Sequence, residues 1–220
     1  MSAARRQTIV YVTSSPFKQA EIEILQEHAV LSDGTPVRDL FQFEIRPVPI
    51  KEVLEVDIRE MVRAEVAKAY EQLKVPCIVE HAGLTFDGYD WYPGGLTKPM
   101  WDTLGIKFVS ETGSEGRRAI ARAVVAYCDG KQIRAFVGET RGCITAEPRG
   151  TREFYWDTVF SPDVDDEKLK GKTYAEIVED SNYGLKFKVL QLSQSTRAML
   201  EFLEFRKLNR PALWLAYSVI

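Results

Sequence analysis

The sequence is poor in the two residue types that most often hold zinc. Its 220 residues include two histidines, His28 and His81, and three cysteines, Cys77, Cys128 and Cys143. So few residues of these types exclude a histidine-rich zinc site and argue against a disulfide framework. We therefore expect reduced thiols and a cytoplasmic protein.

The sequence also lacks a charge excess and a long apolar run. Lys and Arg number 29 and Asp and Glu 32, a net charge of −3, so the positive charge expected of a general nucleic-acid binder is missing. No apolar run approaches the roughly 20 residues that cross a bilayer, and the apolar stretch after the N-terminal arginines is too short for a signal-peptide core. We expect neither a nucleic-acid partner nor a membrane association.

What the sequence does contain is an alternation of strand and helix patterns. β-branched and aromatic residues run from 8 to 13, and apolar positions recur at helical spacing from 57 to 73. The predicted order is strand 8–13, helix from 16, strand 43–48, helix 57–73, strand 75–79, helices near 98–104 and 114–121, strands 119–127 and 132–144 joined at Asp129-Gly130, and helix 195–207. This order predicts an α/β fold with a long mixed central sheet, in a single domain over residues 1–220.

The turn between the first strand and the first helix is the first candidate binding segment. It carries the small hydroxyl residues Thr13, Ser14 and Ser15, with Lys18 one turn into the helix. Free backbone N–H groups and the helix dipole at such a turn favour a phosphate, and a lysine adds a charged contact. The same residues also fit an ordinary capped helix with a solvated lysine.

A second candidate lies where the strand at 75–79 is predicted to end, at Glu80 and His81. Ligands of α/β sheets usually bind at the carboxyl ends of strands. A carboxylate there can bind Mg²⁺, and a neighbouring group can orient or deprotonate water. A strand that simply becomes polar at the surface explains these residues equally well.

Two further groups of residues carry chemistry of interest. The acidic residues Glu52, Glu55 and Asp57 precede the long helix, where they fit either dipole partners or a metal ligand directed into a cleft. The segment 154–157 places aromatic side chains beside Asp157, which suits stacking on a nucleobase and accepting a hydrogen bond from its edge. A core aromatic cluster with a turn aspartate is the alternative.

Taken together and in this order, these features resemble the inosine triphosphate pyrophosphatase family, over about residues 8–205. The matching segments are 13–18 for the family's T-G-N-x-x-K, Glu52 before the second helix, VEHAGL at 79–84 for V-E-D-S/T-G-L, YPGGLTK at 92–98, the G-x-x-x-G-x-I-x-x-x-P-R-G pattern at 138–150, FYWDTVF at 154–160, and KTYAEI at 172–177. No single segment is decisive, but seven in register make homology the best interpretation over a chance likeness of an unrelated α/β protein.

The resemblance implies a long mixed sheet with two α/β lobes flanking a substrate cleft, usually in a homodimer. It implies Mg²⁺-assisted attack of water on the α-phosphorus of a triphosphate with a deaminated purine, such as ITP, dITP or XTP, which releases pyrophosphate. By position, the catalytic residues would be Lys18, Glu80 and His81, the metal ligands Glu52 and Glu80, and the substrate-binding residues Thr13, Ser14, Ser15, Lys18, Lys98, Arg149, Phe154, Trp156, Asp157, Lys188 and Ser193.

The chain departs from the family pattern at several of these positions. His81 replaces the catalytic aspartate of V-E-D, Tyr155 replaces a glycine, and residues 193–195 lack the His and Arg of the family's S-H-R. An imidazole can act as a general base but is a poorer Mg²⁺ ligand than a carboxylate. One interpretation is an active pyrophosphatase with shifted nucleotide specificity and a changed water-activating group. The other is a weak or inactive member that binds nucleotide or acts as a scaffold. Retention of Lys18 and Glu80 favours activity.

Overall fold

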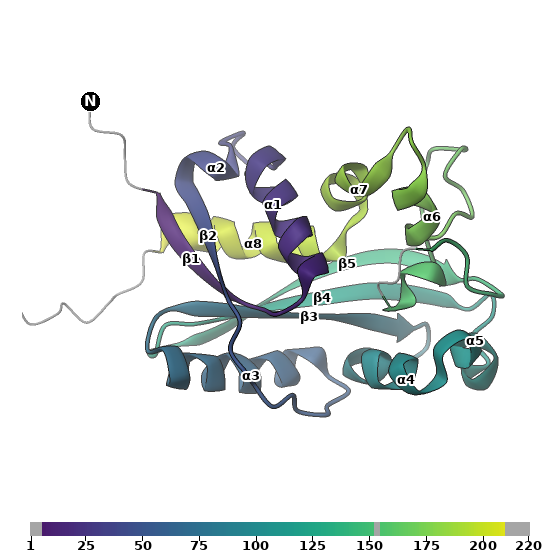
Figure 1. Cartoon of the computed structure of the whole chain (residues 1–220), viewed down its shortest axis with the longest axis horizontal. Helices are drawn as coiled ribbons and strands as arrows, with labels where there is room; N and C mark the ends of the chain where they lie inside the picture. The colour runs from purple at the N-terminus through teal and green to yellow at the C-terminus, as the bar shows by residue number, and fades with distance from the viewer. Residues whose placement is uncertain (1–5, 152–154, 210–220) are drawn as a thin grey trace, which may run out of the picture.

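The computed structural model describes residues 6–151 and 155–209, whose strands form one six-stranded sheet in the order β2-β1-β3-β4-β5-β6 (Figure 1). The strands are β1 (Gln7–Val12), β2 (Phe41–Arg46), β3 (Cys77–Phe86), β4 (Arg118–Cys128), β5 (Ile133–Ile144) and β6 (Phe160–Pro162). β1 is parallel to β2 and β3, and the remaining neighbours are antiparallel. The predicted α/β fold with a mixed central sheet is therefore confirmed.

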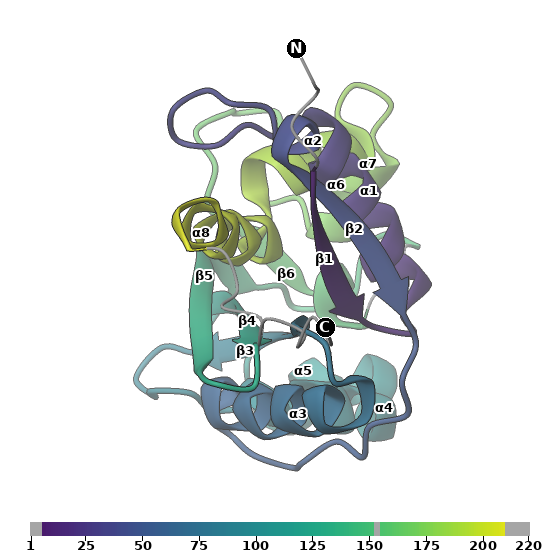
Figure 2. The ribbon, with the colours of Figure 1, turned by 90° about the vertical axis from the view of Figure 1, so that its left-hand side faces the viewer.

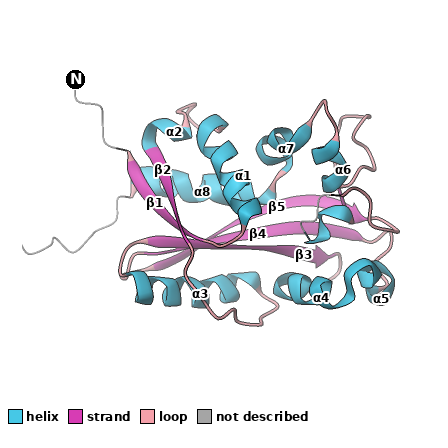
Figure 3. Cartoon of the chain, in the orientation of Figure 1, coloured by secondary structure: helices cyan, strands magenta, loops and turns pink. Residues whose placement is uncertain are grey.

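Helices cover both faces of this sheet (Figures 1 and 3). On one face lie α3 (Ile58–Leu73), α4 (Thr97–Leu104) and α5 (Phe108–Thr112). On the other lie α1 (Pro16–His28), α2 (Val37–Leu40), α6 (Tyr174–Glu179), α7 (Gly184–Phe187) and α8 (Gln194–Leu208). Short 3₁₀ segments span Gly94–Leu96, Gly105–Lys107 and Tyr155–Thr158, and a π-helical segment spans Lys188–Leu192. No helix in the described residues is long and apolar enough to cross a bilayer.

The two helices that border the predicted site begin at side-chain caps. The Ser15 hydroxyl accepts a hydrogen bond from the Lys18 backbone N–H, and Pro16 occupies the start of α1. Asp57 caps α3 by accepting from the backbone N–H of Arg59. Both caps satisfy N–H groups that a helix start leaves unpaired. The predicted starts of both helices are thus confirmed.

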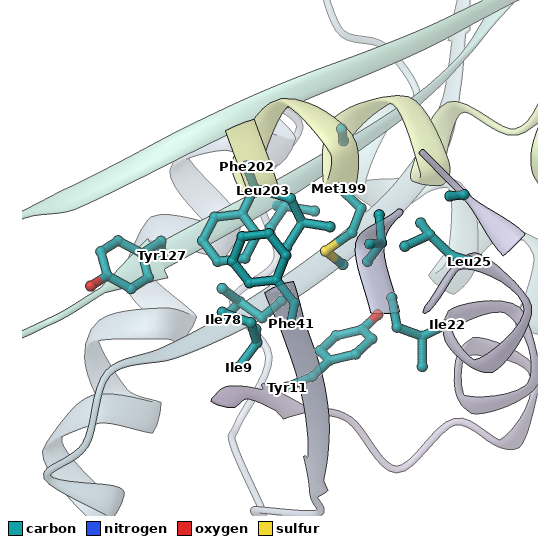
Figure 4. Close-up of a cluster of buried hydrophobic side chains, with 14 of the residues drawn as sticks. Ile9, Tyr11, Ile22, Leu25, Phe41, Ile78, Tyr127, Met199, Phe202 and Leu203 are labelled. Atoms are coloured by element: carbon teal, nitrogen blue, oxygen red, sulfur yellow. The ribbon is translucent and has the colours of Figure 1, made fainter. Parts of the chain in front are cut away.

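The core divides between the two faces because strand side chains alternate. Toward α1 and α8, Tyr11 and Ile78 pack with Leu25 and Phe202 (Figure 4). Toward α3, Val79 packs in a second cluster of aliphatic side chains. A third cluster, around Trp156, fills the far end of the sheet. Neighbouring residues of β3 therefore point into different environments.

β1 and β3 stay paired over a short distance only. Their register covers Val10 with Cys77 and Tyr11 with Ile78, while β3 continues to Phe86 alongside β4. Figure 2 shows β1 and β2 running obliquely to the long strands β3–β5. The edge of β3 beyond Ile78 is consequently open toward the turn that follows β1.

Two local predictions were wrong. β3 does not end at residues 80–81, because its full length pairs with β4, and Glu80 and His81 lie within it. The helix predicted at 114–121 is absent: Gly113 and Gly116 have positive φ angles, which favour a turn, and β4 starts at Arg118. Long-range strand pairing overrode the local pattern there. The single domain with two lobes over residues 1–220 stays a prediction.

Candidate functional site

A cavity of about 320 Å³ opens where β1 and β3 separate. Its size lies within the range of small-molecule sites. Its walls come from the β1–α1 turn, the loop between β2 and α3, α3 itself, β3, the start of α4 and residues 155–156. The predicted site residues that line it are Thr13, Ser14, Ser15, Lys18, Glu52, Glu80, His81, Lys98 and Trp156. Residues from motifs far apart in the sequence thus meet at one cavity.

Glu80 lies at the cavity wall in a buried cluster of hydrogen-bonded side chains. Its Oε2 lies 3.0 Å from Lys18 Nζ and accepts a hydrogen bond of 2.8 Å from the Tyr11 hydroxyl, and its Oε1 accepts one of 3.0 Å from the Ser195 hydroxyl. Lys18 Nζ also donates to the backbone carbonyl of Glu80. The carboxylate of Glu80 therefore holds the Lys18 ammonium group at the cavity while both of its oxygens are engaged.

The protonation state of this cluster follows from its contacts. Burial alone would raise the pKa of Glu80, but the charge of Lys18 and the hydrogen bonds from Tyr11, Lys18 and Ser195 lower that pKa below its usual value. Burial and the neighbouring Glu80 charge raise the pKa of Tyr11 well above its usual value. At neutral pH, Glu80 is therefore ionised and Tyr11 keeps its proton as a donor.

His81 points to the opposite face of β3 and meets a residue of α3. His81 Nε2 lies 2.6 Å from Glu65 Oε2, with the His81 side chain 21% exposed and that of Glu65 2%. The second oxygen of Glu65, Oε1, is buried and has no hydrogen-bond partner among the described residues. Both side chains line the cavity. The cavity therefore holds a histidine–carboxylate pair next to the lysine–carboxylate pair.

Sequence reasoning missed Glu65, Tyr11 and Ser195 as site residues. For Glu65 a signal was present, because it lies on the buried side of α3 between Met61 and Val66, where a charge is out of place. For Tyr11 the sequence carries no such signal, and Ser195 stands within the segment that matches the family's S-H-R but lacks its His and Arg. A tyrosine in a buried strand and a serine near a helix start are ordinary there.

The β1–α1 turn opens into the cavity. Thr13 Oγ1 accepts a hydrogen bond of 3.1 Å from the Ser15 backbone N–H, and Ser15 caps α1. The capped-helix interpretation is thus correct, but the lysine is not a solvated one, because the Lys18 side chain is 18% exposed and ion-paired. A helix N-terminus and an ammonium group together favour an anion.

Glu52 and Glu55 both lie in the loop between β2 and α3, but their carboxylates have different surroundings. Gly95 approaches the Glu55 carbonyl so closely that a Cβ on Gly95 would lie 2.1 Å from that oxygen. Glu55 turns its carboxylate onto its own loop, where Oε1 accepts from the Val56 backbone N–H at 2.8 Å. Glu52 lines the cavity and Glu55 does not. No group of three or more His, Cys, Asp or Glu residues in the described chain could hold a metal by itself.

The cavity is also lined by Lys98 and two aromatic residues, Tyr155 and Trp156. Lys98 Nζ lies 2.7 Å from Asp102 Oδ2 and 5.4 Å from the centre of the Tyr155 ring. Trp156 is buried and packs edge-to-face on Phe160. Among these three residues, Lys98 and Tyr155 are therefore the more accessible.

Four predicted substrate-binding residues do not line the cavity. Lys188 and Asp157 are buried together, with Lys188 Nζ 3.5 Å from Asp157 Oδ2. Ser193 caps α8, and the Arg149 guanidinium lies 3.4 Å from Glu176 Oε2. Phe154, also predicted to bind substrate, lies outside the described residues. The binding roles of these five residues stay predictions.

Comparison with known proteins gives a consistent result. Residues 9–204 match the model of the Ham1 family. The chain is 31% identical over 203 residues to an inosine triphosphate pyrophosphatase of Kluyveromyces lactis, covering 90% of this chain and 94% of that protein. It is 34% identical over 143 residues to a dITP/XTP pyrophosphatase of Methanopyrus kandleri, covering 63% of this chain and 69% of that protein.

Solved structures agree on the fold. A HAM1 protein from Coxiella burnetii superposes with a TM-score of 0.63 at 20% identity, covering 90% of this chain and 98% of that one. The Ham1 protein of Staphylococcus aureus gives a TM-score of 0.58 at 17% identity, covering 91% of this chain and all of the other. With the family model matching nearly the whole sequence and the sheet matching these structures, the chain belongs to the Ham1 family.

Proposed function

We propose that this protein hydrolyses nucleoside triphosphates with a deaminated purine, such as ITP, dITP or XTP, to the monophosphate and pyrophosphate. The observation that carries the proposal is the cavity itself, which is lined by the start of α1, the Lys18–Glu80 pair and the His81–Glu65 pair. Relatives named as inosine triphosphate and dITP/XTP pyrophosphatases support the substrate class. An inactive binding protein is the less favoured alternative.

The triphosphate would bind with its phosphates at the β1–α1 turn. The N–H groups at the start of α1 and the Lys18 ammonium group stabilise negative charge there. Water attacks the α-phosphorus, the bond to the bridging oxygen breaks, and pyrophosphate leaves. Lys18 stabilises the charge that develops on the phosphate oxygens in the transition state. The ion pair with Glu80 holds Lys18 at the cavity.

The proposal includes Mg²⁺, which such sites usually bind through one or two carboxylates together with substrate phosphates and water. The donors present fit an ion held in this way, because Glu52 is a cavity carboxylate. Both oxygens of Glu80 already accept hydrogen bonds, so we assign Glu80 to Lys18 and Glu52 to the metal. When bound, the ion would neutralise phosphate charge.

A cytoplasmic homodimer also belongs to the proposal. The dimer is what the family resemblance implies, and free Cys77, Cys128 and Cys143 fit a reducing compartment. Light scattering coupled to size exclusion tests the dimer, and a mass equal to one chain would contradict it.

A substrate panel tests the function. Purified protein is incubated with Mg²⁺ and ITP, dITP, XTP, ATP or GTP, while pyrophosphate and monophosphate are measured. We expect turnover of the deaminated nucleotides, strong loss in Lys18→Met, and normal turnover in Lys68→Met, which changes an exposed lysine of α3. If no nucleotide exceeds the Lys18→Met background, the proposal is wrong. Thermal stabilisation by nucleotide without turnover would then support the binding protein.

A further inference from the structure

We propose that Glu65 is a positioning residue that orients His81 as the base that activates water. The inference rests on the hydrolysis proposed above and adds a residue to its mechanism. It starts from the 2.6 Å contact between His81 Nε2 and Glu65 Oε2 at the cavity wall. It also answers how the chain can work with a histidine at residue 81, where the family pattern has an aspartate.

The contact determines which ring nitrogen of His81 is available. A carboxylate accepts hydrogen bonds and does not donate them, so the Glu65 contact places the proton of a neutral His81 on Nε2. Nδ1 then carries the lone pair, and no described residue hydrogen-bonds to it. The His81 side chain lines the cavity and is 21% exposed, so a water molecule in the cavity can contact the ring.

The other cavity carboxylates are less suited to this task. Glu80 accepts hydrogen bonds from Tyr11 and Ser195 and pairs with Lys18, and its side chain is only 3% exposed, so water has little access to it. Glu52 is exposed on a loop, without a helix or strand to hold it. His81, by contrast, lies within β3, and Glu65 lies within α3. A base must be held in a defined orientation, which two packed elements provide.

The burial of Glu65 indicates a purpose beyond packing. It lies on the buried face of α3 beside Val62 and Val66, where an apolar residue would fill the space without desolvating a charge. Its Oε1 lacks a hydrogen-bond partner among the described residues. A buried carboxylate with one oxygen unsatisfied costs stability. What the buried Glu65 carboxylate provides in return is its contact with His81.

In the proposed step, His81 accepts a proton from the attacking water. Nδ1 of neutral His81 takes one proton from water as the water oxygen forms its bond to the α-phosphorus. The bond between that phosphorus and the bridging oxygen breaks, and the electron pair leaves with pyrophosphate. His81 becomes an imidazolium ion, which the negative charge of Glu65 stabilises, and it then releases the proton to solvent.

Kinetics of variants test the pair. We expect His81→Gln and Glu65→Ala each to lower kcat for ITP by about 100-fold or more with little change in KM. Glu65→Gln keeps the shape and a hydrogen-bond acceptor but loses the charge, so its loss should be smaller than that of Glu65→Ala. The double variant Glu65→Ala/His81→Gln should be no slower than His81→Gln, because both act in one step. Glu60→Gln, an exposed position of α3, should behave as wild type.

The orientation itself can be measured without activity. Nitrogen-15 NMR of the imidazole rings reports which nitrogen carries the proton. The chain has two histidines, so His28→Gln assigns both sets of signals. We expect His81 to be the Nε2–H tautomer in the wild type and a mixture of tautomers in Glu65→Ala. A folded Glu65→Gln protein provides the comparison if Glu65→Ala does not fold.

The outcomes separate the two proposals. A wild type inactive on every nucleotide overturns the proposed function and this inference with it. An active wild type whose kcat survives His81→Gln or Glu65→Ala overturns this inference alone. Additive losses of kcat in the double variant also contradict it, as does a His81 tautomer that is unchanged in Glu65→Ala. Glu65 would then have only a structural role.

Discussion

Two lysine–carboxylate clusters each include one residue of α1, and the two clusters differ in solvent exposure. Lys18 pairs with Glu80 at the cavity, where its side chain is 18% exposed. Glu21, three residues later, lies 2.8 Å from Lys188 Nζ, and Lys188 is 1% exposed and also pairs with Asp157. The same types of residue therefore occur once at a surface that a ligand can reach and once in the interior.

The difference shows that burial decides what a charged pair can do. Burial would lower the pKa of Lys188, but the charges of Asp157 and Glu21 raise it above its usual value, so Lys188 stays charged. Enclosed in this way, it ties α1 to the 3₁₀ segment at 155–158 and to the π-helical segment. If Lys18 turned from Glu80 to a phosphate, the buried Glu80 carboxylate would keep its hydrogen bonds from Tyr11 and Ser195.

The largest effect is expected from Lys188→Met. It leaves the buried Asp157 and the partly buried Glu21 without their lysine, which should lower the free energy of unfolding by about 3–5 kcal/mol. Chemical denaturation measures this, with the exposed Lys186→Met as control. A stable Lys188→Met protein that has lost substrate affinity would instead assign Lys188 to the substrate, as the resemblance implied.

Lys18→Met should show the opposite pattern. We expect kcat/KM for ITP to fall by about 10²–10³-fold, or about 2.7–4 kcal/mol of transition-state stabilisation. The melting temperature should change less than in Lys188→Met. Steady-state kinetics and thermal unfolding of the two variants side by side check the contrast. Equal losses of stability would remove the distinction between the clusters.

Glu80→Gln sharpens the comparison through pH. Because the pKa of Glu80 is lowered in the folded protein, its charge stabilises the fold above the unfolded pKa of about 4.3, and this contribution is lost as pH falls through the folded pKa. We expect the variant to be about 1–3 kcal/mol less stable at pH 7 and the difference to shrink on acidification. Urea unfolding between pH 7 and pH 3 measures it, and a difference independent of pH would contradict the assignment.

The smallest effects are expected from the hydroxyl donors around Glu80. Tyr11→Phe and Ser195→Ala each remove one hydrogen bond to the carboxylate and should cost about 0.5–1.5 kcal/mol of stability. Activity should fall less than in Lys18→Met, because Lys18 keeps its ion pair. The two variants and their double variant, in denaturation and kinetics, test this order. A loss of activity as large as that of Lys18→Met would place these hydroxyls at the chemistry.

Much of the fold was readable from local patterns. Ser15-Pro16 marked the start of α1, Asp129-Gly130 marked the β4–β5 hairpin, and helical spacing predicted α3. The errors at residues 80–81 and 114–121 have one cause. Residues 80–81 and the end of the second segment belong to the long β3–β4 ladder, whose pairing is set by residues about forty positions away and not by local propensity.

The candidate site was predictable where its residues belong to a local motif. The β1–α1 turn, the Glu80-His81 pair and Lys98 were found in this way, and the structure brings them to one cavity. The residues that contact Glu80 and His81 from distant parts of the sequence were not predicted. Tyr11 and Ser195 are 69 and 115 residues from Glu80, and Glu65 is 16 residues from His81. Such contacts follow from packing, which a single sequence does not display.

The sequence by itself determined the order of elements, the helix caps, the family and which charged residues the chain has to place. The tertiary structure decided what those charges face. Because side chains alternate along β3, Glu80 points toward α1 and α8 while His81 points toward α3. Because β1 leaves β3 after Ile78, a cavity opens beside both of them. Packing alone therefore explains why the lysine–carboxylate pair at Lys188 is buried while the one at Lys18 can be reached by a ligand.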